Sequence, residues 1–191
     1  MRDETVARNY AEALFDIAGR EGQLEAYGEA MESVARILAE WRQEFPNLAV
    51  APMGVVGRVR RLSTFFLRGM EETWAKFGLN VAGFDVLSTL LRAGAPYSLS
   101  PGDLIASTMV TSGTMTNRID QLEKAGLVDR IRNPEDGRGS FISLTEKGFD
   151  VIDKAVTEHV ATQHRLVSGL SQTQQKDLNR LLKSFLADLE N

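Results

Sequence analysis

The chain has 191 residues, of which 43% are hydrophobic and 25% are charged, so it can bury a core and lacks the composition of a disordered protein. It contains no cysteine, which excludes disulfides, cysteine metal sites and thiol redox sensing. The N-terminus lacks the apolar segment of a secretory signal, and no apolar run is long enough to cross a bilayer. We therefore expect a cytoplasmic protein that does not associate with a membrane.

The net charge of −4 argues, on its face, against a nucleic-acid partner. The acidic residues are concentrated at one end, however. Residues 1–40 hold four arginines and nine acidic residues, a net charge of about −5, which leaves about +1 for the remainder. The larger part of the chain can therefore face a phosphate backbone locally.

The first half of the chain predicts helices. Residues 4–40 are rich in Ala, Glu, Leu and Arg, and the stretch GREGQ divides this helical region in two. The stretch QEFPNLAVAPMG contains Pro46, Pro52 and Gly54 and predicts an extended connector. A further helix is predicted from about Gly54 to Phe77, because apolar side chains recur there every three or four residues.

Three shorter helices are predicted next. One lies in FGLNVAGFDVLSTLLRAG, and a second begins after Ser100, which fits as its N-cap with Pro101 as the first helical residue. The third runs from Thr111 to Gly126, and its buried face consists of Met115, Ile119 and Leu122. Gly126 fits as the glycine that ends this helix.

The segments LVDRIR and GSFISLT alternate apolar and polar residues, as half-buried strands do, and NPEDGRG between them is a turn by composition. Two strands joined by a turn directly after a helix-turn-helix make a wing. The chain then returns to helix, with Val151, Ile152, Ala155 and Val160 on one side, and Ser171 caps a last helix with an apolar stripe. The predicted fold class is therefore mainly α with a small β wing (α+β), a winged helix-turn-helix flanked by long helices.

The exposed face of the helix over Thr111–Gly126 has the residue types that a major groove requires, which are small and hydrogen-bonding. Asn117 can donate to and accept from adenine, and serine and threonine hydroxyls can reach bases or phosphates. Arg118 is expected to contact phosphate. A polar first turn with capping hydroxyls is the alternative interpretation of the same residues.

The turn between the strands places Arg138 at the tip of the wing, where a lone arginine can enter a narrow minor groove, with Asp136 holding the guanidinium. Arg130 and Arg132 are candidates for phosphate contacts, and a solvated strand face is the alternative. The predicted DNA-binding residues are Thr111, Ser112, Gly113, Thr114, Thr116, Asn117, Arg118, Arg132, Asp136 and Arg138.

The segment LSPGDLIASTMVTSGTMTNRIDQLEKAGLVDRIRNPEDGRGSFISLTEKG resembles the winged-helix core of the MarR (multiple antibiotic resistance regulator) transcription factors. The most specific element is the wing pattern D-x-R followed by L-T, and the likeness extends over about residues 31–189. The resemblance implies a homodimeric repressor that dimerises through its N- and C-terminal helices and is released by small ligands. Two departures from the family reduce positive charge, because Asn117 and Gly137 stand where many members carry arginine.

Within residues 4–40, VARNYAEALFDIAGREGQLEAYGEAMESVARIL is similar to the N-terminus of the ATP synthase delta subunit. A stator fragment is therefore an alternative for this segment, although a stator role would need the whole helical domain of that subunit. The predicted domains are an acidic helical extension (1–41), dimerisation and scaffold helices (42–98), the DNA-binding core (99–146) and C-terminal dimerisation helices (147–191).

An enzyme is not expected, since His159 and His164 lack the spacing of a helical metal pair and no nucleophile or oxyanion site is evident. We expect no cofactor and no metal. The expected partners are double-stranded DNA and a second copy of the chain, and a small aromatic or amphipathic effector is a candidate. Its pocket would use Phe65, Phe66, Met70, Trp74 and Phe84, which core or interface packing also explains. A winged helix that binds protein instead of DNA is the second class of function considered.

Overall fold

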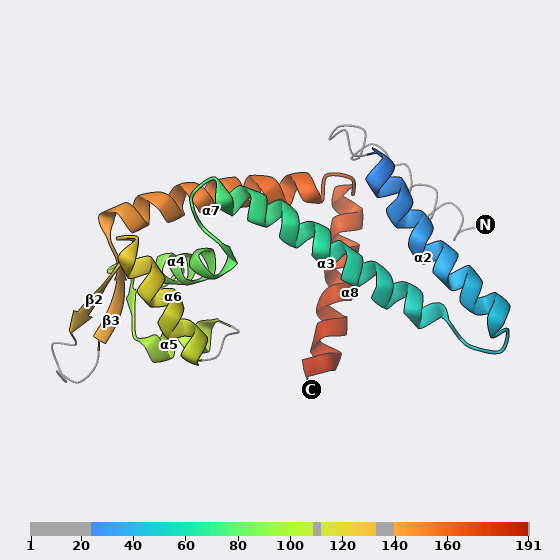
Figure 1. Ribbon diagram of the computed structural model, residues 1–191, viewed down its shortest axis with the longest axis horizontal. Coiled ribbons are helices and arrows are strands. Elements are labelled where there is room, and N and C mark those ends of the chain that lie inside the picture. The colour runs from blue at the N-terminus through green and yellow to red at the C-terminus, as the bar shows by residue number, and fades with distance from the viewer. Residues whose placement is uncertain (1–23, 109–111, 133–139, 191) are drawn as a thin grey trace. The chain divides into compact units, whose positions relative to one another are not determined.

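The computed structural model describes residues 24–108, 112–132 and 140–190 (Figure 1). In these ranges the elements are α2 (Leu24–Glu44), α3 (Ala51–Ala75), α4 (Val81–Arg92), β1 (Ser98–Leu99), α5 (Pro101–Ser107), α6 (Ser112–Lys124), β2 (Val128–Arg132), β3 (Ser140–Leu144), α7 (Glu146–Leu166) and α8 (Gln172–Glu190). The chain divides into two compact units. One comprises Met1–Phe66 with His164–Asn191, and the other, Leu67–Gln163, contains the helix-turn-helix and the strands.

The predicted fold class is confirmed. The predicted helix start at about Gly54 is wrong. Helix α2 extends to Glu44 and α3 already begins at Ala51, so the connector is shorter than the sequence suggested. Pro52 lies in the first turn of α3, where a missing N–H costs nothing because the first four amides of a helix have no intrahelical partner. The proline that was expected to interrupt the helix therefore helps to begin it.

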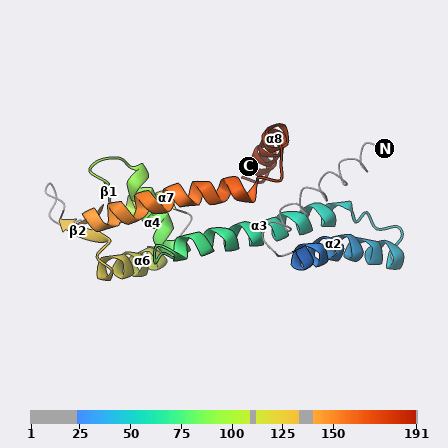
Figure 2. The same ribbon diagram turned by 90° about the horizontal axis from the view of Figure 1, so that it is seen from above.

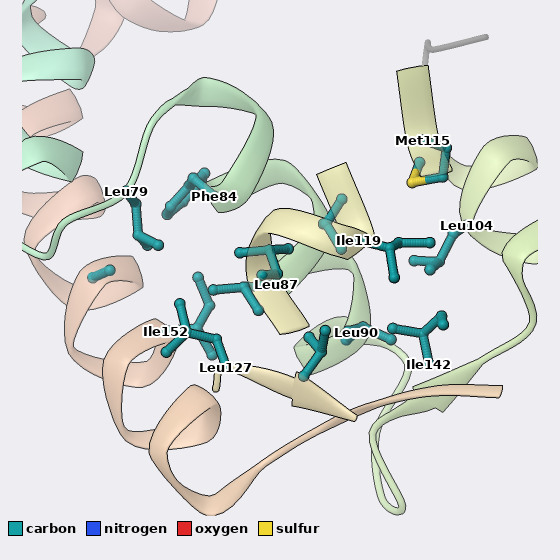
Figure 3. Packing of buried hydrophobic residues seen from close by; sticks show 14 of the residues in the cluster. Leu79, Phe84, Leu87, Leu90, Leu104, Met115, Ile119, Leu127, Ile142 and Ile152 are labelled. Carbon is teal, nitrogen blue, oxygen red and sulfur yellow. The ribbon is translucent and has the colours of Figure 1, made fainter. Parts of the chain in front are cut away.

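The core of the unit Leu67–Gln163 forms where α4, α5 and α6 meet the sheet (Figure 3). Leu87, Leu104 and Ile142 are fully buried, and Met115 and Ile119 of α6 are nearly so. Each such side chain contributes about 1.5–3 kcal/mol of transfer free energy on burial. The predicted buried face of α6 is confirmed, because Leu122 is also in this core.

The sheet has three antiparallel strands in the order β1-β3-β2. Strand β2 pairs with β3 so that Val128 lies opposite Leu144 and Arg130 opposite Ile142. Strand β1 pairs Ser98 with Ser143. The sequence did not predict β1, because a strand of two residues has no alternation to detect.

Helix α6 ends in a Schellman motif, as the placement of Gly126 predicted. The Gly126 N–H donates to the Glu123 carbonyl at 2.9 Å, and the Leu127 N–H donates to the Leu122 carbonyl at 2.9 Å. Gly126 has a φ of 70°, which glycine adopts at no steric cost. Leu122 and Leu127 are both buried, so the motif also has its usual hydrophobic contact.

The start of α7 is attached to this helix end through Thr145. The Thr145 hydroxyl accepts from the Gly148 N–H at 2.9 Å, as an N-cap does, and donates to the Gly126 carbonyl at 2.8 Å. The Lys147 ammonium donates to the Ala125 carbonyl at 2.8 Å, where the dipole of α6 is negative. The end of α6 and the start of α7 therefore share one hydrogen-bonded junction.

In the other unit, α2 packs beside the first half of α3 (Figure 2). The Arg61 guanidinium donates to the Ser33 hydroxyl at 2.9 Å, and Leu38 is buried. Ser171 and Gln174 cap α8 reciprocally, which confirms the predicted cap. The apolar stripe of α8 is exposed throughout, and consists of Leu178, Leu181, Leu182, Phe185, Leu186 and Leu189. In α7, Ile152 and Ala155 of the predicted apolar side are fully buried, whereas Val160 of the same side is 44% exposed.

Gly148 permits a close approach that a larger residue would block. A Cβ at this position would lie 1.9 Å from the Leu127 carbonyl oxygen, and a backbone atom cannot move aside cheaply. We expect Gly148→Ala to lower the free energy of unfolding by about 3 kcal/mol, measured by urea denaturation. The matched control is Gly102→Ala in α5, where the nearest side-chain atom would be 3.6 Å away. Equal stability of the two variants would contradict the described junction.

Candidate nucleic-acid interface

The exposed face of α6 carries neutral hydrogen-bonding side chains. Thr116 and Asn117 are exposed, while Met115 and Ile119 on the opposite face are buried. The Asn117 amide offers a donor and an acceptor, which is the pair of groups that matches the major-groove edge of adenine. The structure thus places two of the predicted reading residues, Thr116 and Asn117, at the surface of an anchored helix.

For several predicted site residues, the structure does not describe the residue or its side chain. Thr111, Asp136 and Arg138 are outside the described residues. Ser112, Gly113 and Thr114 lie in the first turn of α6, and their side chains are not described. Their roles in DNA binding remain predictions.

Arg118 is turned toward α4. Its side chain is 18% exposed, and Nη1 lies 3.9 Å from Oδ2 of Asp85. The distance is at the long end for an ion pair, so a direct hydrogen bond is not made. Unlike Asn117, this side chain is partly buried, and the phosphate contact expected from the sequence remains a prediction.

Arg130 reaches back from β2 to the second half of α6. Its Nη2 donates to the Asp120 carboxylate, and its Nη1 lies 2.9 Å from Oε2 of Glu123. The hydrogen bond to Asp120, together with the negative charges of both acids, raises the pKa of Arg130. We call Arg130, Asp120 and Glu123 the Arg130 cluster. The sequence did not predict this cluster, because its members are separated by a helix end and a turn.

Arg132 is exposed at the end of β2 and lies outside the Arg130 cluster. It occupies the same face of the strand as Arg130, since side chains two residues apart in a strand point the same way. A contact between its guanidinium and a DNA phosphate remains a prediction.

The aromatic residues proposed for an effector pocket are divided between the two compact units. Phe65 and Phe66 belong to one compact unit, whereas Met70, Trp74 and Phe84 belong to the other. Within the second unit, Trp74 and Phe84 are buried and stack with ring centroids 4.7 Å apart, and Met70 packs against the same core. These three residues are therefore used in packing.

His159 of α7 completes this aromatic cluster. The Trp74 indole N–H donates to Nδ1 of His159 at 3.2 Å, and the Phe84 and His159 rings lie 4.8 Å apart. Nδ1 can accept this bond only while it is unprotonated. Burial lowers the pKa of His159, so the neutral form is favoured.

Among the residues that the structure describes, no group of His, Asp and Glu side chains could hold a metal ion. The described helices also include none with the length and apolar character needed to span a membrane.

Family models and characterised relatives match most of the chain. The MarR family model matches residues 77–139, and the model of the ATP synthase delta (OSCP) subunit matches residues 6–53. The transcriptional regulator PecS of Dickeya dadantii is 38% identical over 149 residues, covering 78% of this chain and 90% of PecS. The transcriptional repressor MprA of Escherichia coli is 28% identical over 160 residues, covering 84% of this chain and 89% of MprA.

Solved structures share the fold. Apo MarR from E. coli is 26% identical with a TM-score of 0.57, and the match covers 67% of this chain and 93% of MarR. A mutant E. coli MarR complexed with operator DNA has a TM-score of 0.60 at 23% identity, covering 76% and 97%. An organohalide-sensing regulator in its 2,4-dichlorophenol-bound form has a TM-score of 0.63 at 17% identity, covering 74% and 82%. The last two likenesses show the fold alone.

The hydrogen bond between Trp74 and His159 makes stability depend on pH. Because the folded-state pKa of His159 is lowered, its contribution to the free energy of unfolding is present above about pH 6.5 and is lost as the pH falls. We expect the wild-type melting temperature to drop between pH 7.5 and pH 5.5 by more than that of His159→Gln. The control is His164→Gln, an exposed position in the same helix, which should follow the wild type. Parallel pH curves for wild type and His159→Gln would refute the assignment.

Proposed function

This chain belongs to the MarR family of transcriptional regulators, and we propose that it represses transcription as a homodimer bound to a pseudo-palindromic site in double-stranded DNA. The observation that carries the proposal is the division of α6 into an anchored apolar face and an exposed face with Thr116 and Asn117. The wing strands β2 and β3 follow this helix directly, which is the arrangement of a winged helix-turn-helix. The characterised relatives are transcriptional regulators, not enzymes.

In this proposal each subunit inserts α6 into a major groove. Asn117 contacts a base edge, Thr116 contacts a base or phosphate, and Arg132 contacts the backbone. Arg138, at the predicted tip of the wing, enters the flanking minor groove, where a narrow A·T-rich groove attracts a guanidinium. Two-fold symmetry then requires half-sites about one helical turn apart, roughly 10 base pairs.

The apolar face of α8 supports the homodimer. Leu181, Phe185 and Leu189 of that face are 58%, 46% and 68% exposed. A contiguous apolar face of this kind marks an interaction site in a soluble protein, and a second copy of the same helix can cover it around a two-fold axis. The proposed C-terminal dimerisation region therefore rests on α8.

A small effector that releases the DNA is part of the proposal. The solved organohalide-sensing regulator holds 2,4-dichlorophenol, which makes an aromatic effector a reasonable first class to screen. Since Trp74 and Phe84 are packed in the core, an effector that binds at them would have to displace packed side chains. An effector site elsewhere would not carry that cost.

The alternative function is a protein-interaction module with no DNA partner. An apolar exposed stripe on α6 would favour it, and the described exposed residues of that helix are instead polar. The match of residues 6–53 to the delta subunit concerns only the N-terminal extension, and we assign no stator role to it.

Asn117 tests the DNA-binding proposal. We expect Asn117→Ala to lose about 1–3 kcal/mol of discrimination at one base pair of each half-site, because a bidentate amide contact is removed. The measurement is fluorescence anisotropy with single-substitution duplexes at a fixed salt concentration. Arg132→Ala is the control and should weaken binding uniformly across sequences. An equal loss on every duplex for Asn117→Ala would show that the amide contacts only the backbone.

Leu181 tests the dimer. We expect Leu181→Glu to shift the protein toward monomer in sedimentation equilibrium, because a carboxylate would be buried at the subunit interface. Thr173→Glu adds the same charge to α8 on the side away from the apolar face and should leave the dimer intact. A wild-type monomer, or a Leu181→Glu dimer of unchanged stability, would rule out α8 as the dimerisation surface.

A further inference from the structure

The Arg130 cluster joins two elements of the proposed DNA-binding surface. Asp120 and Glu123 are three residues apart, so they lie on the same side of α6. Arg130 bridges both carboxylates from β2, with one contact to each of its two terminal nitrogens. A guanidinium suits this position because its planar donors can bond two carboxylates at once.

The position of Arg130 is fixed by the sheet. It lies opposite Ile142 of β3, and directly opposed residues of an antiparallel pair project to the same face. Ile142 is fully buried in the core with Ile119 of α6, so this face of the sheet is directed toward the helix. The backbone of Arg130 therefore cannot shift without disturbing a core residue.

The cluster lies next to the reading residues. Asp120 is one turn after Thr116 and Asn117 on the same helix. The two carboxylates face one guanidinium, which leaves one negative charge in excess in the cluster. If Arg130 left them to contact a DNA phosphate, two unpaired carboxylates would remain near the polyanion. That cost favours a guanidinium that stays on the acids.

We propose that Arg130 is a positioning residue, which holds the second half of α6 against β2 and does not contact DNA phosphate. This inference rests on the proposed DNA-binding function and assigns a role within that surface. Two arginines on the same strand face then have different roles. Arg130 sets the angle of α6, and Arg132 contacts the DNA backbone.

The test is anisotropy over a range of KCl concentrations, with the best-bound duplex from a random pool and a scrambled duplex. We expect Arg130→Gln to weaken binding to the selected duplex roughly tenfold and to the scrambled duplex less than about twofold, with an unchanged salt slope. Arg132→Gln is the matched control, and should lower the salt slope by about one. The exchange variant Asp120→Arg/Arg130→Asp keeps the three charges and should recover binding to within about threefold of wild type.

Two results would overturn the inference. One is a salt slope for Arg130→Gln that falls as it does for Arg132→Gln, and the other is an exchange variant as weak as Arg130→Gln. If Arg130→Gln does not fold by circular dichroism, Asp120→Asn/Glu123→Gln decides, since positioning predicts weaker binding and a phosphate contact predicts tighter binding. If the wild type enriches no duplex from the pool, the proposed DNA-binding function itself is refuted.

Discussion

The orientation of α6 depends on one junction, where this helix ends, β2 begins, β3 ends and α7 begins. The Thr145 hydroxyl bonds both to the Gly126 carbonyl and to the Gly148 N–H, and the Thr145 N–H donates to the Leu127 carbonyl at 3.2 Å. Only glycine fits at position 148, because the Leu127 carbonyl occupies the space that a side chain would need. These contacts give a physical reason for the T-x-x-G part of the pattern after the wing, because Thr145 satisfies a backbone group of the helix end and Gly148 makes room for one.

Two of the arginines on this surface, Arg118 and Arg130, lie beside acidic side chains. Arg130 is held by Asp120 and Glu123, and the Arg118 guanidinium lies 3.9 Å from the Asp85 carboxylate. The family resemblance implies that Asn117 stands where many members carry arginine. The proposed mode of binding therefore relies on neutral hydrogen bonding at the base edges, with fewer positive charges at the backbone. Such a protein needs an accurately placed helix, which the junction and the Arg130 cluster both supply.

The sequence was sufficient for elements whose signal is local. The buried spacing of Met115, Ile119 and Leu122, the glycine end at Gly126 and the caps at Ser100 and Ser171 were all predicted and are confirmed. Contacts between elements were not predicted, since Arg130 meets Asp120 only after a helix end and a turn reverse the chain. Strand β1 is too short for a pattern, and Pro52 gave the wrong helix start because a proline suits a first turn as well as a connector. Arg138, which the sequence places at the tip of the wing, lies outside the described residues.

The most direct measurement of the central claim is selection of bound sites from a random duplex pool by the full chain at a stated salt concentration. The account predicts an enriched pseudo-palindrome with half-sites about 10 base pairs apart, centre to centre, and with A·T-rich flanks. It also predicts that affinity falls steeply as salt rises, through counterion release. A pool without enrichment, or an enriched site without two-fold symmetry, would contradict a dimer that reads DNA with α6.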